Sequence, residues 1–260
     1  MSAVVPAQKT ARVIAIVNQK GGVGKSTTAV NLGASLALLG RRVLVVDIDP
    51  QGNTTTGVGV DKRAVQRDVY NVLLERVAIA DVVRPTDVEN LAIAPATLNL
   101  AGAEVELVSA LQRENRLKSA LSPILHDYDE VLIDCPPSLG LLTINALTAA
   151  HEMIIPVQAE YYALEGLSQL VAIVRRIKEG LNPDLTIRGV LITMFDGRTK
   201  LATEVLEEVH RYFPDRVFQT QIPRNIRLSE APSYGKPAIL FDVKSRGAQA
   251  YLSLARELAS

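Results

Sequence analysis

The residues Asn18–Thr28, NQKGGVGKSTT, say more about the fold than any other part of this 260-residue chain. They follow the apolar run RVIAIV at Arg12–Val17 and precede a second apolar run, AVNLGASLALLG. The general phosphate-binding loop reads G-x-x-x-x-G-K-[ST], and Gly24–Ser26 supply its last three positions. Its first glycine is missing, because Gln19 occupies that position, and a second lysine, Lys20, stands inside the loop. The sequence therefore predicts a phosphate-binding loop of an unusual kind.

An apolar strand, a glycine-rich turn and a helix follow one another here, which is the context that phosphate binding requires. Glycines allow backbone N–H groups to turn toward phosphate oxygens, and the N-terminus of the following helix adds a positive dipole end. In such loops the lysine, here Lys25, reaches the β- and γ-phosphates, and the hydroxyl group of Ser26 binds Mg²⁺. The dinucleotide-binding pattern G-x-G-x-x-G does not fit, because Thr27 occupies its last glycine position.

Three carboxylates stand close to the ends of apolar runs. The segment VLVVDIDPQGN places Asp47 and Asp49 after one run, and VLIDCPPS places Asp134 after another. Ligands of open α/β sheets bind at the carboxyl ends of the strands, so we expect these acids near the phosphate loop. Asp134 has the position of a Walker B carboxylate near Mg²⁺. Either segment alone could instead provide a helix N-cap or a turn residue.

Short β-branched runs alternate with helical patterns along the chain, which predicts βαβ units around a parallel sheet. The strands are almost wholly apolar, as expected when helices cover both faces of the sheet. We predict an α/β fold of the P-loop NTPase type with a mostly parallel twisted sheet, in a single domain, 11–260, after a flexible tail, 1–10. The predicted strands are Arg12–Val17, Arg42–Asp47, Leu91–Ala94, Glu130–Asp134, Met153–Val157 and Arg188–Met194, and the predicted helices are Ser26–Leu39, Glu104–Leu125, Leu164–Glu179, Ala202–Tyr212 and Gly247–Leu258.

Composition narrows the class of protein further. Hydrophobic residues make up 48% of the chain and Trp is absent, which suits a layered α/β protein. The single cysteine, Cys135, excludes a disulfide or a cysteine-based zinc site within one chain, and we expect it to be a small buried residue. No apolar run reaches the ~18 residues of a membrane span, and the N-terminus lacks the pattern of a secretory signal. A cytoplasmic location is therefore expected.

The formal net charge is zero, yet the charges are unevenly distributed. The segment Glu75–Asp134 carries 11 acidic and 5 basic side chains, whereas Arg216–Arg246 carries 2 acidic and 6 basic ones. Such clusters usually belong to a solvated surface, so they do not by themselves indicate a partner. The basic segment is a lead for nucleic-acid binding, which depends on locally clustered cations rather than on net charge.

Four segments together resemble the ParA/Soj family of chromosome- and plasmid-partitioning ATPases. They are KGGVGKST, DIDPQGN, DCPPS and IPRNIRLSEAPSYGKP, and they occur in the family's order from about Arg12 to Leu258. The loop alone is typical of the wider group with a deviant Walker A motif, which includes the septum-positioning MinD, nitrogenase iron protein and arsenite-pump ATPases. The IPRN…SEAPS segment favours the partition branch.

The resemblance explains the second lysine of the loop. In that group the residue at the position of Lys20 crosses an ATP-sandwich dimer and contacts the phosphates bound by the other subunit, so that nucleotide controls dimerisation. The resemblance further implies that Asp49 orients or activates the attacking water and that Asp134 supports the Mg²⁺ shell through water. Pro223 and Asn225 would frame and hydrogen-bond the adenine. The implied phosphate-binding residues are Lys20, Gly21, Gly22, Val23, Gly24, Lys25, Ser26 and Thr27, with Lys20, Lys25, Asp49 and Asp134 in catalytic roles.

The resemblance also implies partners and a cycle. We expect a slow ATPase that uses ATP and Mg²⁺, forms a homodimer on ATP and binds double-stranded DNA without sequence preference, which makes it nucleoid-associated. A ParB/Spo0J-type centromere-binding protein is expected to stimulate hydrolysis. Arg198 and Arg227 rank first as DNA contacts, because both lie in segments that match the partition branch. The full set of candidate DNA-binding residues is Arg198, Lys200, Arg224, Arg227, Lys236, Lys244 and Arg246.

Other classes of protein fit less well. An iron–sulfur protein of this group needs bridging thiolates that a single Cys135 does not supply. A MinD-like membrane protein needs a basic amphipathic C-terminal extension, whereas this chain stops at YLSLARELAS, which reads as a core-facing helix. A metabolic phosphoryl-transfer enzyme or ligase would respond to a small acceptor rather than to DNA and a partner protein. The acid at Asp49 argues against a nucleotide-gated binding module with negligible catalysis, although a slow ATPase would look similar to one.

Overall fold

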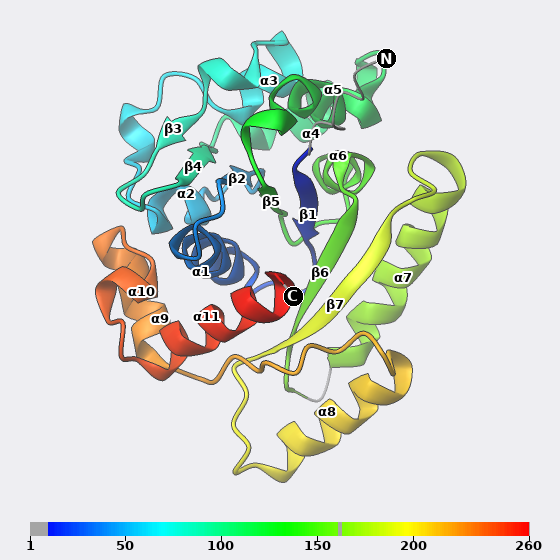
Figure 1. Ribbon diagram of the computed structural model, residues 1–260. Helices are drawn as coiled ribbons and strands as arrows, with labels where there is room; N and C mark the ends of the chain where they lie inside the picture. The colour runs from blue at the N-terminus through cyan, green and yellow to red at the C-terminus, as the bar shows by residue number, and fades with distance from the viewer. Residues whose placement is uncertain (1–9, 161–162, 260) are drawn as a thin grey trace, which may run out of the picture.

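The computed structural model describes residues 10–160 and 163–259. The predicted flexible tail, apart from residue 10, therefore lies outside the described residues. Within them, a central sheet is covered by helices on both faces (Figure 1). The prediction of an α/β fold with a mostly parallel sheet is confirmed.

In residues 10–160 and 163–259 the sheet has seven strands, in the order β3-β4-β2-β5-β1-β6-β7. All neighbouring strands are parallel except β3 and β4, which pair antiparallel at one edge. The first strand, β1, thus lies inside the sheet, and later strands lie on both sides of it, as in doubly wound sheets. The strands are β1 (Arg12–Ile16), β2 (Val43–Asp47), β3 (Arg84–Pro85), β4 (Leu91–Ala94), β5 (Glu130–Asp134), β6 (Glu152–Gln158) and β7 (Thr186–Thr193).

Alternate side chains of β1 enter two different hydrophobic clusters. Val13 and Ala15 belong to the cluster under α3 to α8, whereas Ile14 and Ile16 belong to the cluster under α1, α10 and α11. This is why the strand is apolar at every position. The helices are α1 (Lys25–Leu38), α2 (Asn53–Gly57), α3 (Val69–Glu75), α4 (Leu100–Glu106), α5 (Arg116–Leu121), α6 (Leu141–Ala149), α7 (Ala163–Gly180), α8 (Lys200–Tyr212), α9 (Ile226–Glu230), α10 (Ala238–Phe241) and α11 (Arg246–Ala259).

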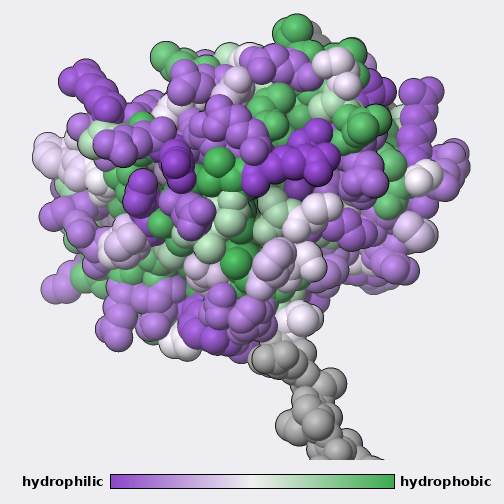
Figure 2. All heavy atoms as spheres, turned by 90° about the horizontal axis from the view of Figure 1, so that it is seen from above, coloured by the Kyte–Doolittle hydropathy of each residue, from purple (hydrophilic) through white to green (hydrophobic). Residues whose placement is uncertain are grey.

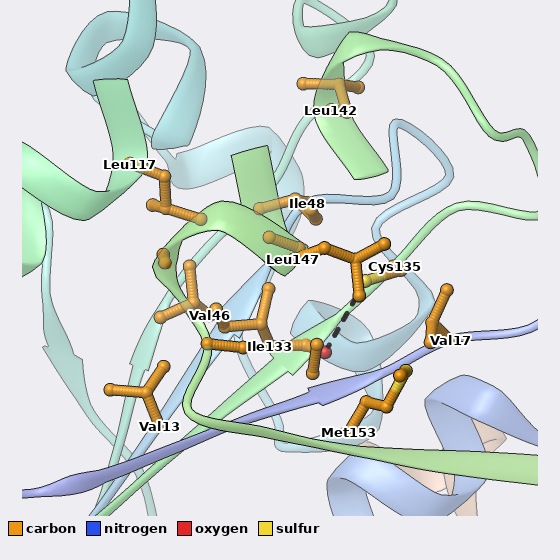
Figure 3. Packing of buried hydrophobic residues seen from close by; sticks show 14 of the residues in the cluster. Val13, Val17, Val46, Ile48, Leu117, Ile133, Cys135, Leu142, Leu147 and Met153 are labelled. Carbon is orange, nitrogen blue, oxygen red and sulfur yellow. Dashed lines mark hydrogen bonds between the residues drawn. The ribbon is translucent and has the colours of Figure 1, made fainter. Parts of the chain in front are cut away.

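Cys135 lies in the first of these clusters. It is fully buried directly after β5, and its Sγ lies 3.9 Å from the Ile133 carbonyl oxygen. Val17, Leu147 and Met153 lie around it (Figure 3). Burial raises the pKa of its thiol well above the usual value, so Cys135 acts as a small apolar residue, as the sequence predicts.

The predicted helix Glu104–Leu125 is wrong. The chain instead forms α4, two short 3-10 turns, α5 and a further 3-10 turn at Ser122–Asp127. Gln112 adopts a left-handed backbone conformation with φ 53°, which a continuous helix does not allow. Leu107 and Leu117 are fully buried on either side of this break. The apolar spacing therefore reflects burial of these leucines and not one uninterrupted helix.

The remaining predicted elements are confirmed to within two residues at each end. The sequence did not predict β3, which is only two residues long, or the short helices α2, α3, α6, α9 and α10. Among the described residues, no helix is both long enough and apolar enough to cross a membrane. Figure 2 shows the molecule from above, where hydrophilic side chains cover most of the face and hydrophobic ones lie between them in small groups.

Candidate nucleotide-binding site

The loop between β1 and α1 leaves its backbone open to a ligand. Gly22 and Gly24 have φ of 74° and 89°, a left-handed conformation that glycine adopts without strain. A Cβ on Gly21 or Gly22 would have no atom of the described chain within 4 Å, so this side of the loop is open there. Among the residues that the structure describes, no side chain caps the N-terminus of α1, and the first turn of this helix holds no acid. The free N–H groups and the helix dipole therefore offer a site for an anion.

Lys25 is held at the floor of this loop. Its side chain is largely buried, and its ammonium group donates to the Lys20 carbonyl at 3.1 Å. Burial lowers the pKa of Lys25, while the negative charges of Asp134 and Asp49 oppose that shift. A buried ammonium close to carboxylates and backed by a carbonyl is placed to meet a phosphate.

Asp134 and Asp47 stand opposite each other at the ends of β5 and β2. The Thr54 hydroxyl donates to Asp134 Oδ2 at 2.7 Å, while Asp134 Oδ1 is buried without a partner among the described residues. Burial raises the pKa of Asp134 to about 6. Buried polar atoms normally have a partner, so this free carboxylate oxygen is suited to bind a water or a cation. The donor set, a carboxylate beside the Ser26 hydroxyl, is of the oxygen type that Mg²⁺ prefers, so these residues fit the predicted ion.

Asp49 lies in a turn that begins just beyond β2. Its carboxylate accepts the N–H of Gln51 at 2.9 Å, and its own N–H donates to Asp47 Oδ1 at 3.1 Å. Asp47 also accepts the N–H and the hydroxyl of Thr55, at 2.8 and 2.7 Å. Burial, together with the charge of Asp134, raises the pKa of Asp47 to about 8. Asp47 thus supports the turn from inside, while Asp49 faces the pocket.

One pocket of about 930 Å³ brings most of the predicted nucleotide-binding residues together. Residues 223 and 225, about 200 positions after the loop, line the same pocket. Five further residues that the sequence analysis does not predict also line this pocket: Asn31, Gln51, Asn53, Lys62 and Tyr251. Only Gln51 and Asn53 lie within a motif that could have pointed to them. The predicted residues on the pocket wall are Gly21, Gly22, Gly24, Lys25, Ser26, Thr27, Asp49, Pro223 and Asn225.

Three other predicted residues lie beside the pocket rather than on its wall. The side chain of Val23 is buried, and its carbonyl accepts the Thr193 hydroxyl at 2.8 Å. Asp134 is fully buried at the end of β5. The Lys20 ammonium points to Glu160, 3.6 Å away, where both side chains are partly exposed.

Asn225 serves first as the N-cap of α9. Its Oδ1 accepts the N–H of Arg227 at 3.1 Å. Its side-chain NH₂ has no hydrogen-bond partner in the part of the chain that the structure describes, so it is the group most available to a base. The paired donor and acceptor edge expected from the sequence is therefore partly used within the fold.

The predicted DNA-binding cations do not form one cluster. A second pocket, of about 830 Å³, brings together Arg198, Arg224 and Arg246. Arg198 donates to both carboxylate oxygens of Asp196, at 2.8 and 2.7 Å, and this hydrogen bonding lowers the pKa of Asp196 to about 2. Both pockets are lined by residues 223 and 224, so the IPRN segment separates them.

The other predicted cations lie elsewhere. Arg227 pairs with Glu230 at 2.8 Å and Asp242 at 3.3 Å, and its guanidinium lies 5.9 Å from the centre of the Phe241 ring. Lys200 pairs with Glu204 at 3.4 Å. Lys236 lines the nucleotide pocket, and Lys244 is outside both pocket walls.

The doubly wound sheet, the glycine loop leading into α1 and the buried lysine define a P-loop nucleotide-binding protein. A family model described as an AAA domain matches residues 11–187.

Sequence comparison narrows this class. The chain is 60% identical to the sporulation initiation inhibitor protein Soj of Bacillus subtilis, over 96% of this chain and 98% of that protein. It is 55% identical to the chromosome partitioning protein ParA of Myxococcus xanthus, over 95% and 87% of the two chains. A crystal structure of cobyrinic acid a,c-diamide synthase from Mycobacterium smegmatis, with bound ADP and magnesium, is 41% identical, has a TM-score of 0.84 and covers 95% of this chain and 93% of its own. The chain belongs to the Soj/ParA family of chromosome-partitioning ATPases.

Proposed function

We propose that this chain binds ATP with Mg²⁺, forms a sandwich dimer, binds DNA without sequence preference and leaves DNA when a ParB-type partner stimulates hydrolysis. The observation that carries the proposal is the single pocket shared by the glycine loop, Asp49 and the IPRN segment. Structures similar to this chain hold ADP or an ATP analogue with magnesium, which supports the same ligands here.

The geometry supports a role for each residue of the pocket. The N–H groups of the loop and the Lys25 ammonium would hold the β- and γ-phosphates. Ser26 would bind Mg²⁺ directly, and Asp134 would hold a water of its shell through the free Oδ1. The ion would neutralise charge on the phosphates. Asp49, fixed by the Gln51 N–H, would orient the attacking water.

The ion pair between Lys20 and Glu160 supports a role for Lys20 outside its own pocket. Both side chains are partly exposed, so the pair contributes little to stability and is easily exchanged. In an ATP-bound dimer the phosphates of the other subunit would replace Glu160 as the partner of Lys20. Dimerisation would then depend on the nucleotide in both subunits.

The second pocket supports DNA binding. Its three arginines can contact phosphates, and a dimer would present two such sets, which strengthens binding through avidity. Because Pro223 and Arg224 line both pockets, the same segment would contact both the nucleotide and the DNA. DNA binding of this kind would make the protein nucleoid-associated and would serve the segregation of chromosome or plasmid origins.

A ligase with a small second substrate is less well supported. Such an enzyme needs its acceptor near the γ-phosphate, whereas the lining of the second pocket includes neither Lys25 nor Asp49.

The decisive experiment measures the ATPase rate with and without DNA and the cognate ParB-type protein. We expect the two together to raise turnover, and we expect Asp49→Ala to bind ATP normally while hydrolysis falls by ~10²–10⁴-fold, the usual effect of losing a general base. An ATPase rate that does not change with DNA and the ParB-type protein, but rises with a small acceptor molecule, would refute the proposal.

A further inference from the structure

Lys62 lies on the wall of the nucleotide pocket, and neither the motifs nor the comparisons give it a role. It is the first residue of a 3-10 turn, Lys62–Ala64, in which the Asp61 side chain accepts the N–H of Arg63 at 3.0 Å. The Lys62 ammonium donates to the Gln51 carbonyl at 2.6 Å. No carboxylate among the described residues forms an ion pair with it within 4.0 Å. The backbone of Lys62 therefore lies in a short capped turn, and its ammonium group is bound to a backbone carbonyl.

The aliphatic stem of Lys62 packs against Gly52. A Cβ on Gly52 would lie 2.5 Å from Lys62 Cδ and 2.8 Å from the Ala96 carbonyl oxygen. Gly52 also has φ 59°, which favours glycine independently. The Lys62 stem can lie this close to the turn because Gly52 has no side chain that would displace it.

The turn under Lys62 is the one that carries Asp49. The Gly52 N–H donates to the Asp49 carbonyl at 2.8 Å, and the Gln51 N–H donates to the Asp49 carboxylate at 2.9 Å. Gln51 is therefore held on both sides, by Asp49 at its N–H and by Lys62 at its carbonyl. Without Lys62, the Gln51 carbonyl would lose its partner and the turn would be held only by the N–H groups of Gln51 and Gly52, which leaves the Asp49 carboxylate less firmly oriented.

We propose that Lys62 is a positioning residue for hydrolysis, which holds the Asp49–Gly52 turn in one conformation and so keeps the Asp49 carboxylate aimed at the attacking water. This inference rests on the role of Asp49 proposed above. A hydrogen bond from a charged donor is stronger than one between neutral groups, which suits a contact that must restrict a loop. Small misplacements of a reacting group lower the rate strongly, so the effect should appear in turnover rather than in binding.

The test compares Lys62→Met, which keeps the stem and removes the ammonium, with Lys62→Arg, which can still donate to the carbonyl. With ATP, DNA and the ParB-type partner, we expect Lys62→Met to lower kcat about tenfold while the KM for ATP changes less than about twofold. Lys62→Arg should restore most of the rate. Arg63→Met is the matched control, because it removes the same charge from the neighbouring residue, and it should behave as the wild type.

Three outcomes would overturn the inference: an unchanged kcat in Lys62→Met, a raised KM at constant kcat, or an equal loss in Arg63→Met. The second would make Lys62 an ordinary nucleotide-binding cation, and the third would make the effect one of overall charge. Asp49→Ala, assayed in parallel, separates the two proposals. If Asp49→Ala is inactive and Lys62→Met is normal, only the role of Lys62 fails. If Asp49→Ala keeps full turnover, the proposed role of Asp49 fails first.

Discussion

Replacing Arg198 by alanine tests the proposal that the second pocket binds DNA. Arg198 shares that pocket with Arg224 and Arg246, and its present partner is Asp196. The Arg198 side chain is 89% exposed, so its ion pair contributes little and can be exchanged for a phosphate. We therefore expect Arg198→Ala to weaken DNA binding while the ATP-dependent dimer persists.

The magnitude follows from the number of arginines. If each of the three contacts one phosphate, a dimer makes about six contacts, and the slope of log affinity against log salt is roughly −5. Affinity should then fall ~10³-fold between about 50 and 200 mM salt. Arg198→Ala removes one contact per subunit, so the slope should flatten by about 2.

Fluorescence anisotropy of a labelled duplex, titrated with the ATP-bound dimer at several salt concentrations, measures this slope. Arg84→Ala is a suitable control, because Arg84 is an exposed arginine on β3, at the opposite edge of the sheet from β7. An unchanged slope in Arg198→Ala, or an equal change in Arg84→Ala, would refute the proposal that the second pocket binds DNA. Asp196→Asn gives an independent check, since freeing Arg198 should strengthen binding.

Three further predictions concern the nucleotide pocket and its acids. Lys25→Ala should abolish ATP binding, measured with a fluorescent analogue, because the backbone cradle alone does not balance the charge of the triphosphate. Lys20→Ala should still bind ATP but remain monomeric in sedimentation, and an undiminished dimer would exclude its role across the interface. Asp47 and Asp134 have folded-state pKa values raised to about 8 and about 6 from an ordinary 3.8, so the folded chain holds their protons longer than the unfolded chain. The nucleotide-free protein should therefore lose stability as pH rises from about 4 to about 8, seen as a falling urea midpoint, and a midpoint that rises over this range would contradict the burial argument.

The sequence determined those features that depend on local order along the chain. The loop around Lys25 is recognisable because a strand, glycines and a helix must follow one another directly for backbone N–H groups to converge. The buried strands are recognisable because a sheet covered on both faces requires apolar residues at every position. The positions of Asp49 and Asp134 near the loop are predictable for the same reason, because acids that come after such strands meet at one edge of the sheet.

Only the tertiary structure decided which distant groups meet and which charges are already bound. The break at Gln112 arises from a backbone conformation that apolar spacing does not encode. Lys62 lies over Gly52 because the turn beyond α2 folds back onto the Asp49 loop, and no motif records that contact. The basic residues of the C-terminal part look equivalent in sequence. In space, Arg198 and Arg246 share one pocket while Lys236 lines the other, because side-chain neighbours are set by packing between elements and not by spacing along the chain.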